Sequence, residues 1–192
     1  MVDILSRQGW TSAQHGRDAC DYDRVGEMIV ILRDPVDRWV SGVAQYLMTR
    51  ILNFTGSQSY IDYAADYDIE MQALSASAFI ISYNPLIERF IFDNLDLLDD
   101  HVWLQSEFFE RIMPHVPRRY VIMSEDFEQQ LHALGIQTFE DGDRNASADN
   151  LDKDMLRNFF RQRLDRKPSL LKKVMLAYTK DYELIRDAPS II

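Results

Sequence analysis

The fold is decided by the stretch Met28-Ile29-Val30-Ile31-Leu32-Arg33-Asp34-Pro35-Val36-Asp37-Arg38-Trp39-Val40-Ser41. Its first five residues form a continuous apolar run rich in β-branched side chains, which is typical of a buried parallel strand. Arg-Asp-Pro ends that strand, because proline disfavours helical backbone in the residue before it. Pro35 suits the first turn of a helix, in which Trp39, Val43, Tyr46 and Leu47 share one face. The stretch therefore predicts a strand, a short turn and an amphipathic helix.

The rest of the chain repeats this alternation of strands and helices. A short strand is predicted at residues 2–5 and a second clear one at residues 119–123. Helices are predicted at residues 12–20, 69–82, 85–95, 103–112, 125–134, 151–164 and 168–186. Gly135 is expected to end the helix before it, since glycine suits that position. The alternation indicates an α/β layered fold around a small parallel sheet, flanked by helices.

Composition and charge restrict the class of protein. The chain has 192 residues, of which 46% are apolar, and this suffices for one domain with a real core. Its net charge of -10 argues against a protein that coats nucleic acid, which needs a basic surface. We therefore expect one domain over residues 1–192, with a loop or insert at 53–68 and a tail at 187–192.

The same sequence indicates a cytoplasmic protein. The apolar runs are far shorter than a membrane span, and the opening MVDILSRQGW is not typical of a signal peptide. Cys20 is the only cysteine, so neither an intrachain disulfide nor a cysteine-based zinc site is expected. A protein in a reducing compartment fits this cysteine usage best.

Two clusters of polar residues follow predicted strands. The first is Ser6-Arg7-Gln8-Gly9-Trp10-Thr11-Ser12, where a glycine lets backbone N–H groups face an anion at a helix start. Arg7 adds a permanent positive charge. The cluster is not a Walker A sequence, and its structural alternative is a turn with an N-cap pair.

The second cluster places Arg33 directly at the carboxyl end of the buried strand, where ligands of open α/β sheets bind. Ser41 follows eight residues later in the predicted helix. An arginine fork and a serine hydroxyl can meet on one phosphate. The structural alternative is an ion pair at the helix start, either Arg33–Asp37 or Asp34–Arg38.

These clusters resemble two motifs of the sulfotransferases. Residues 33–41 follow the pattern R-[DN]-P-x-x-R-x-x-S, which resembles the 3′-phosphate-binding motif of that family. The first cluster resembles the family's opening P-loop, K-x-G-x-T-[ST], with Arg7 in place of lysine. Other segments resemble the carbohydrate-type branch in the same order along the chain, namely 99–105 (D-x-H-x-x-x-Q), 120–127, 135–136, 145–147 (N-x-S) and 177–184. The resemblance runs from residue 4 to residue 185.

The resemblance implies a P-loop-NTPase-like three-layer domain that moves a sulfuryl group. The donor would be 3′-phosphoadenosine 5′-phosphosulfate, and the acceptor a hydroxyl or amine of a small molecule or carbohydrate. The scheme requires no metal ion. Residues implied to cradle the 5′-phosphosulfate are Arg7, Gly9, Trp10, Thr11 and Ser12. Residues implied to hold the 3′-phosphate are Arg33 and Ser41, and Arg144 is implied to cover the donor.

The sequence departs from the family pattern between the P-loop and Arg33, because this interval is shorter than usual. In the family that interval often supplies the general base and part of the acceptor pocket. The candidates for the base are His15, whose imidazole has a suitable pKa, Glu27, since some carbohydrate sulfotransferases use a glutamate, and His101, which matches a histidine of the family. The short interval also leaves open a degenerate relative that binds nucleotide or protein without turnover. A small kinase is the third alternative, although the Walker A lysine is absent.

Overall fold

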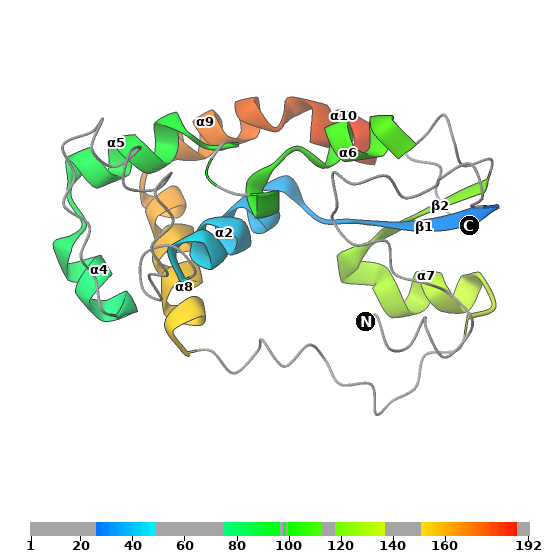
Figure 1. Ribbon diagram of the computed structural model, residues 1–192, viewed down its shortest axis with the longest axis horizontal. Helices are drawn as coiled ribbons and strands as arrows, with labels where there is room; N and C mark the ends of the chain where they lie inside the picture. The colour runs from blue at the N-terminus through cyan, green and yellow to red at the C-terminus, as the bar shows by residue number, and fades with distance from the viewer. Residues whose placement is uncertain are drawn as a thin grey trace. The chain divides into compact units, whose positions relative to one another are not determined.

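The computed structural model describes residues 26–48, 75–96, 98, 100–112, 118–136 and 151–187 (Figure 1). These residues belong to two compact units, each assembled from segments that lie far apart in the sequence. The first unit takes its described residues from Met1–Asp34, Gln105–Ala148 and Lys180–Ile192. The second takes them from Pro35–Leu104 and Asp149–Thr179. The chain therefore passes several times between the two units, and the predicted domain boundaries stay predictions.

The described residues of the first unit include two parallel strands, β1 (Glu27–Leu32) and β2 (Arg118–Met123), drawn beside each other in Figure 1. Glu27 lies opposite Arg118, and Leu32 opposite Met123. Both strands begin one residue before the predicted ranges, and their parallel pairing confirms the expected α/β class. Each strand can pair in parallel with the other because the long intervening chain forms the crossover.

Helices cover both faces of this small sheet. Neighbouring residues of a strand point to opposite faces, and Val121 and Ile122 illustrate this. Val121 packs in one cluster with Phe109 of α6 (Gln105–Ile112) and with the α10 (Thr179–Asp187) side chains of Leu184 and Ile185. Ile122 packs on the opposite face in a cluster of its own, whose members include residues of α7 (Phe127–Ala133). The first unit is therefore layered, with helix, sheet and helix in turn.

The end of α7 confirms the prediction for Gly135. A 3₁₀ turn, η4 (Ser124–Asp126), precedes α7, so the predicted helix at 125–134 is shorter than expected. Gly135 has a φ of 74°, in the left-handed region that glycine adopts at little cost. The N–H groups of Gly135 and Ile136 donate to the carbonyls of His132 and Leu131, and this closes the helix.

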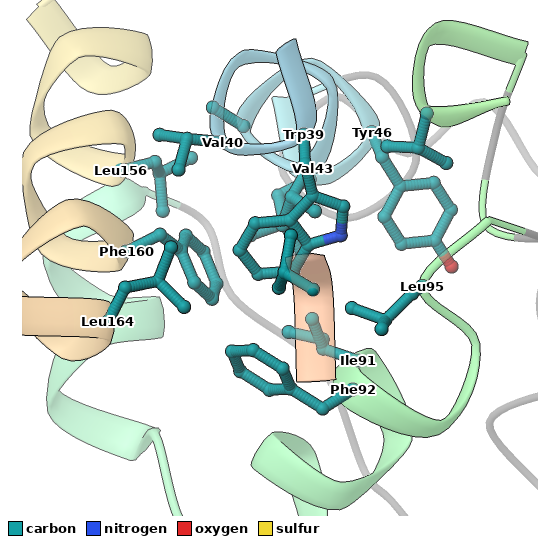
Figure 2. Packing of buried hydrophobic residues seen from close by; sticks show 14 of the residues in the cluster. Trp39, Val40, Val43, Tyr46, Ile91, Phe92, Leu95, Leu156, Phe160 and Leu164 are labelled. Carbon is teal, nitrogen blue, oxygen red and sulfur yellow. The ribbon is translucent and has the colours of Figure 1, made fainter. Parts of the chain in front are cut away.

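The second unit is helical and is built around α2 (Pro35–Tyr46). Its other elements are α4 (Ala76–Ser82), α5 (Pro85–Asp93), η3 (Asp100–Val102), α8 (Leu151–Arg166) and α9 (Pro168–Ala177). The predicted apolar face of α2 is confirmed, because Trp39, Val43, Tyr46 and Leu47 are all buried. Trp39 lies against the rings of Phe92 and Phe160, at centroid distances of 5.0 and 5.9 Å (Figure 2).

One predicted helix proved wrong, because residues 168–186 form two helices rather than one. Helices α9 and α10 are separated at Tyr178, whose side chain is fully buried. Its hydroxyl donates to the carbonyl of Leu95 at 3.2 Å and to that of Val102. The apolar periodicity of the sequence continues through Tyr178 and therefore does not predict the break between the two helices. We attribute the break to the tertiary contacts of the Tyr178 side chain.

An ion-pair cluster joins three elements of the second unit. Glu88 of α5 accepts from Nε of Arg163 in α8 at 2.6 Å and from Nζ of Lys167, before α9, at 2.7 Å. Burial by itself raises the pKa of Glu88, but the hydrogen bonds and charges of Lys167 and Arg163 outweigh it. The pKa of this carboxyl is therefore held below its usual value.

Replacing Glu88 by glutamine is expected to lower the free energy of unfolding near neutral pH by about 1.5–3 kcal/mol, since hydrogen bonds to charged groups contribute that much. This contribution is present above the ordinary glutamate pKa of about 4.3 and disappears as the pH falls through the lower pKa of the folded protein. Urea denaturation of both proteins from pH about 7 to about 3 measures it. Glu128→Gln, at an exposed position of α7, is the control. A difference for Glu88→Gln that stays constant down to the lowest pH would contradict the assignment.

Candidate functional site

Arg33 is the first residue after β1 and stands at the carboxyl end of the parallel pair. It is half-buried and belongs to the first unit. Helix α2 begins two residues later and carries Ser41, a half-buried residue of the second unit. The predicted strand-end position of Arg33 and helical position of Ser41 are therefore confirmed. Their binding of a phosphate stays a prediction.

Gln105 holds the backbone of Arg33 through both ends of its side-chain amide. The Arg33 N–H donates to Oε1 of Gln105 at 3.0 Å, and Nε2 of Gln105 donates to the Arg33 carbonyl at 2.9 Å. Gln105 is itself buried and is the first residue of α6. The amide therefore pairs with Arg33 as a neighbouring strand would, one residue beyond the end of the ladder between β1 and β2.

Asp181 in turn holds the start of α6. Its carboxylate is fully buried, and it accepts from the backbone N–H groups of Gln105 at 2.9 Å and Ser106 at 2.8 Å. The first N–H groups of a helix have no partner within the helix, and a negative charge is favourable there. In the sequence, Gln105 and Asp181 stand out only as members of longer segments, and no pattern there predicts this network. The one signal that could have pointed to Gln105 and Asp181 as site residues was that each lies in a segment resembling the family.

In the second unit, the segment around His101 is held against α2. The side chain of Arg38 donates to the backbone carbonyl of His101, and Asp37 forms an ion pair with Arg161 of α8. A Cβ atom at Gly42 would lie 2.7 Å from Cγ1 of Val102 and 2.8 Å from the carbonyl oxygen of His101. Only glycine allows this approach without a shift of η3. His101 itself, one candidate for the general base, has an exposed side chain.

Glu27, another candidate for the base, lies at the opposite end of β1 from Arg33. It is the first residue of the strand and is exposed. Six residues at a rise of about 3.3 Å separate its Cα from that of Arg33 by about 20 Å. Glu27 is thus at the amino end of the sheet, whereas ligands of parallel sheets bind at the carboxyl end. This position argues against Glu27 as the base of a reaction beside Arg33.

The remaining predicted site residues lie outside the described part of the chain. They are Arg7, Gly9, Trp10, Thr11, Ser12, His15 and Arg144. The strand expected at 2–5, the helix expected at 12–20 and the loop or insert expected at 53–68 lie outside it too. These expectations stay predictions.

Two absences among the described residues and the comparisons with known proteins complete the description of the site. Among the described residues, no group of three or more His, Cys, Asp or Glu side chains is arranged to hold a metal ion. Within the same ranges, no helix has both the length and the apolar character that crossing a membrane requires. The chain matches no family model, no curated protein and no solved structure. What is established is an α/β protein with an arginine held at the carboxyl end of a parallel strand.

Proposed function

We propose that the chain is a sulfotransferase, which moves a sulfuryl group from 3′-phosphoadenosine 5′-phosphosulfate to a hydroxyl or amine acceptor. The observation that carries the proposal is the backbone of Arg33, held by Gln105 at the carboxyl end of β1, directly before the helix with Ser41. Ligand phosphates bind at this edge of parallel sheets. The proposal includes a P-loop-type fold, of which the layered first unit would be a part.

A second line of support comes from the contacts among the segments that resemble the family. In the first unit, hydrogen bonds join Arg33 of one segment to Gln105 of the next, and Gln105 to Asp181 of the last. In the second unit, Arg38 bonds to the carbonyl of His101, and Tyr178 to that of Val102. Segments that are far apart in the sequence are thus neighbours within each unit.

The proposed reaction needs positioning and charge stabilisation. The acceptor oxygen or nitrogen attacks sulfur while the bond from sulfur to the bridging oxygen of the 5′-phosphate breaks. The acceptor's proton passes to a general base, for which His15 and His101 are the better candidates. Arg33 and Ser41 would anchor the donor through its 3′-phosphate, and Arg7 would stabilise the charge that grows on the leaving oxygen.

Replacing Arg33 by alanine is expected to weaken binding of 3′-phosphoadenosine 5′-phosphate by at least about tenfold. The reason is that a hydrogen bond to a charged group contributes about 1.5–3 kcal/mol, and 1.4 kcal/mol is a factor of ten. Binding of AMP, which has no 3′-phosphate, should be weak in both proteins and should change little. Isothermal titration calorimetry with the two nucleotides measures both affinities.

The control for charge is Arg89→Ala, which removes an arginine that is 71% exposed on the second unit. It should leave both affinities as they are in the wild type. Equal affinities of the wild type for the two nucleotides would contradict the proposed function.

A screen for transfer of labelled sulfate to sugars, lipids, phenols and peptides then separates the enzyme from a degenerate relative. Selective nucleotide binding without any transfer would favour the degenerate nucleotide- or protein-binding domain. Hydrolysis of nucleoside triphosphates would instead favour a phosphoryl-transfer enzyme.

A further inference from the structure

The side chain of Gln105 makes its two hydrogen bonds to a single residue, and that residue is Arg33. The donor and acceptor of a primary amide match the carbonyl and N–H of one residue, in the manner of a strand pair. The ladder between β1 and β2 ends with Leu32 and Met123. Beyond it, the backbone of Arg33 is held at 3.0 and 2.9 Å by this amide.

The backbone of Gln105, which carries this side-chain amide, is itself held in place by hydrogen bonds. The backbone N–H of Gln105 and that of Ser106 donate to the two carboxylate oxygens of Asp181. Asp181 has no exposed surface, and Gln105 is 8% exposed. Both side chains are therefore largely shielded from bulk water, and the position of Gln105 is set by the first turn of α6.

The network joins three parts of the chain that are far apart in the sequence. Arg33 and Gln105 are separated by 72 positions, and Gln105 and Asp181 by 76. Each of the three lies within two residues of a point where the chain leaves or enters the first unit, namely after Asp34, before Gln105 and before Lys180. The network therefore fixes the backbone of Arg33 directly beyond the end of the strand ladder.

We propose that Gln105, held by Asp181, is the positioning residue that sets the direction in which the Arg33 side chain leaves β1 toward the donor's 3′-phosphate. This inference rests on the proposed function. A guanidinium at the end of a long side chain moves far when its own φ and ψ change, and bidentate binding of phosphate tolerates little misplacement. Gln105 thus acts on selectivity for the 3′-phosphate through Arg33, without touching the nucleotide.

The test is the ratio of the affinities for 3′-phosphoadenosine 5′-phosphate and AMP in the full chain carrying Gln105→Met. Methionine keeps the length of the side chain and removes both hydrogen bonds. The affinity for the 3′-phosphorylated nucleotide should fall about three- to tenfold, as expected for the loss of one or two ordinary hydrogen bonds. The affinity for AMP should not change. Amide hydrogen exchange at Arg33 should become faster, because its N–H loses its acceptor.

Two controls separate positioning from a general loss of stability. Ser106→Ala removes a buried hydroxyl that has no hydrogen-bond partner among the described residues, and it should leave the ratio unchanged. Val121→Ala weakens the core of the first unit and should lower stability while the ratio stays that of the wild type. Asp181→Asn keeps one carbonyl acceptor and should move the ratio in the same direction as Gln105→Met, by less. It provides the same test should Gln105→Met fail to fold.

The outcomes distinguish this inference from the proposed function. If the wild type prefers the 3′-phosphorylated nucleotide and Gln105→Met keeps the preference, the positioning role is overturned and the proposed function stands. Equal loss of affinity for both nucleotides in Gln105→Met also overturns it. If the wild type shows no preference, the proposed function fails and the positioning role fails with it.

Discussion

Replacing Arg7 by alanine is expected to depress sulfate transfer by about two to three orders of magnitude, the effect of removing one preorganised donor that stabilises charge in a transition state. Negative charge grows on the bridging oxygen as the sulfuryl group leaves, and a cation at that oxygen gains most at that moment. Binding of 3′-phosphoadenosine 5′-phosphate should weaken much less than turnover. Turnover on an acceptor found in the transfer screen, with nucleotide affinity from calorimetry, measures both.

Two variants serve as matched controls for Arg7→Ala. Arg7→Lys restores the residue that is usual in the family motif and should retain or raise activity. Arg89→Ala removes an exposed arginine of the second unit that belongs to none of the quoted segments, and turnover should be that of the wild type. If Arg7→Ala changes neither turnover nor binding, the opening cluster is only a structural turn. The degenerate-relative alternative then becomes the better one.

The general base can be identified in the same assay. His15→Ala and His101→Ala should differ, because only the loss of the base lowers turnover and removes the corresponding limb of the pH profile. Glu27→Gln is expected to have little effect, since Glu27 lies at the amino end of β1. A large loss of turnover in Glu27→Gln would contradict the placement of the reaction at the carboxyl end of the strands.

Replacing Trp39 by alanine is expected to lower the free energy of unfolding by about 3–5 kcal/mol, which is usual for a large aromatic residue in a core. Trp39 is fully buried, and its ring contacts Phe92 of α5 and Phe160 of α8 (Figure 2). Truncation at Cβ would leave a cavity where three helices of the second unit meet. Urea denaturation followed by circular dichroism gives the difference.

Trp39→Phe is the informative companion variant. The indole Nε1 of Trp39 has no hydrogen-bond partner among the described residues, so phenylalanine removes an unpaired donor and keeps most of the ring. The loss in free energy of unfolding should therefore be clearly smaller for Trp39→Phe than for Trp39→Ala. Leu176→Ala, at a position that is 64% exposed, should change stability by no more than about 0.5 kcal/mol. A loss below about 1 kcal/mol for Trp39→Ala would contradict the central position of this side chain.

The candidate site could be predicted only in part, because the sequence indicated the positions of some of its residues and not the roles of others. Arg33 after a strand and Ser41 on the next helix follow from one apolar run and one proline, and both positions are confirmed. The role of Gln105 could not be predicted from the sequence. The local pattern around a glutamine at a helix start is the same whether its side-chain amide hydrogen-bonds to water or to a backbone far along the chain. For Glu27, the sequence placed it near Arg33 along the chain. An extended strand separates the two ends, and this weakens its candidacy as the base.

By itself, the sequence determined the local elements: the strand–turn–helix at residues 27–46, the second strand, and the end of α7 at Gly135. Such features depend on periodicity, on proline and glycine, and on side chains that act within a few residues. Only the tertiary structure decided the break at Tyr178, the division into two units and the network of Arg33, Gln105 and Asp181. The break and the network depend on hydrogen bonds between residues more than seventy positions apart, whose partners no local pattern specifies.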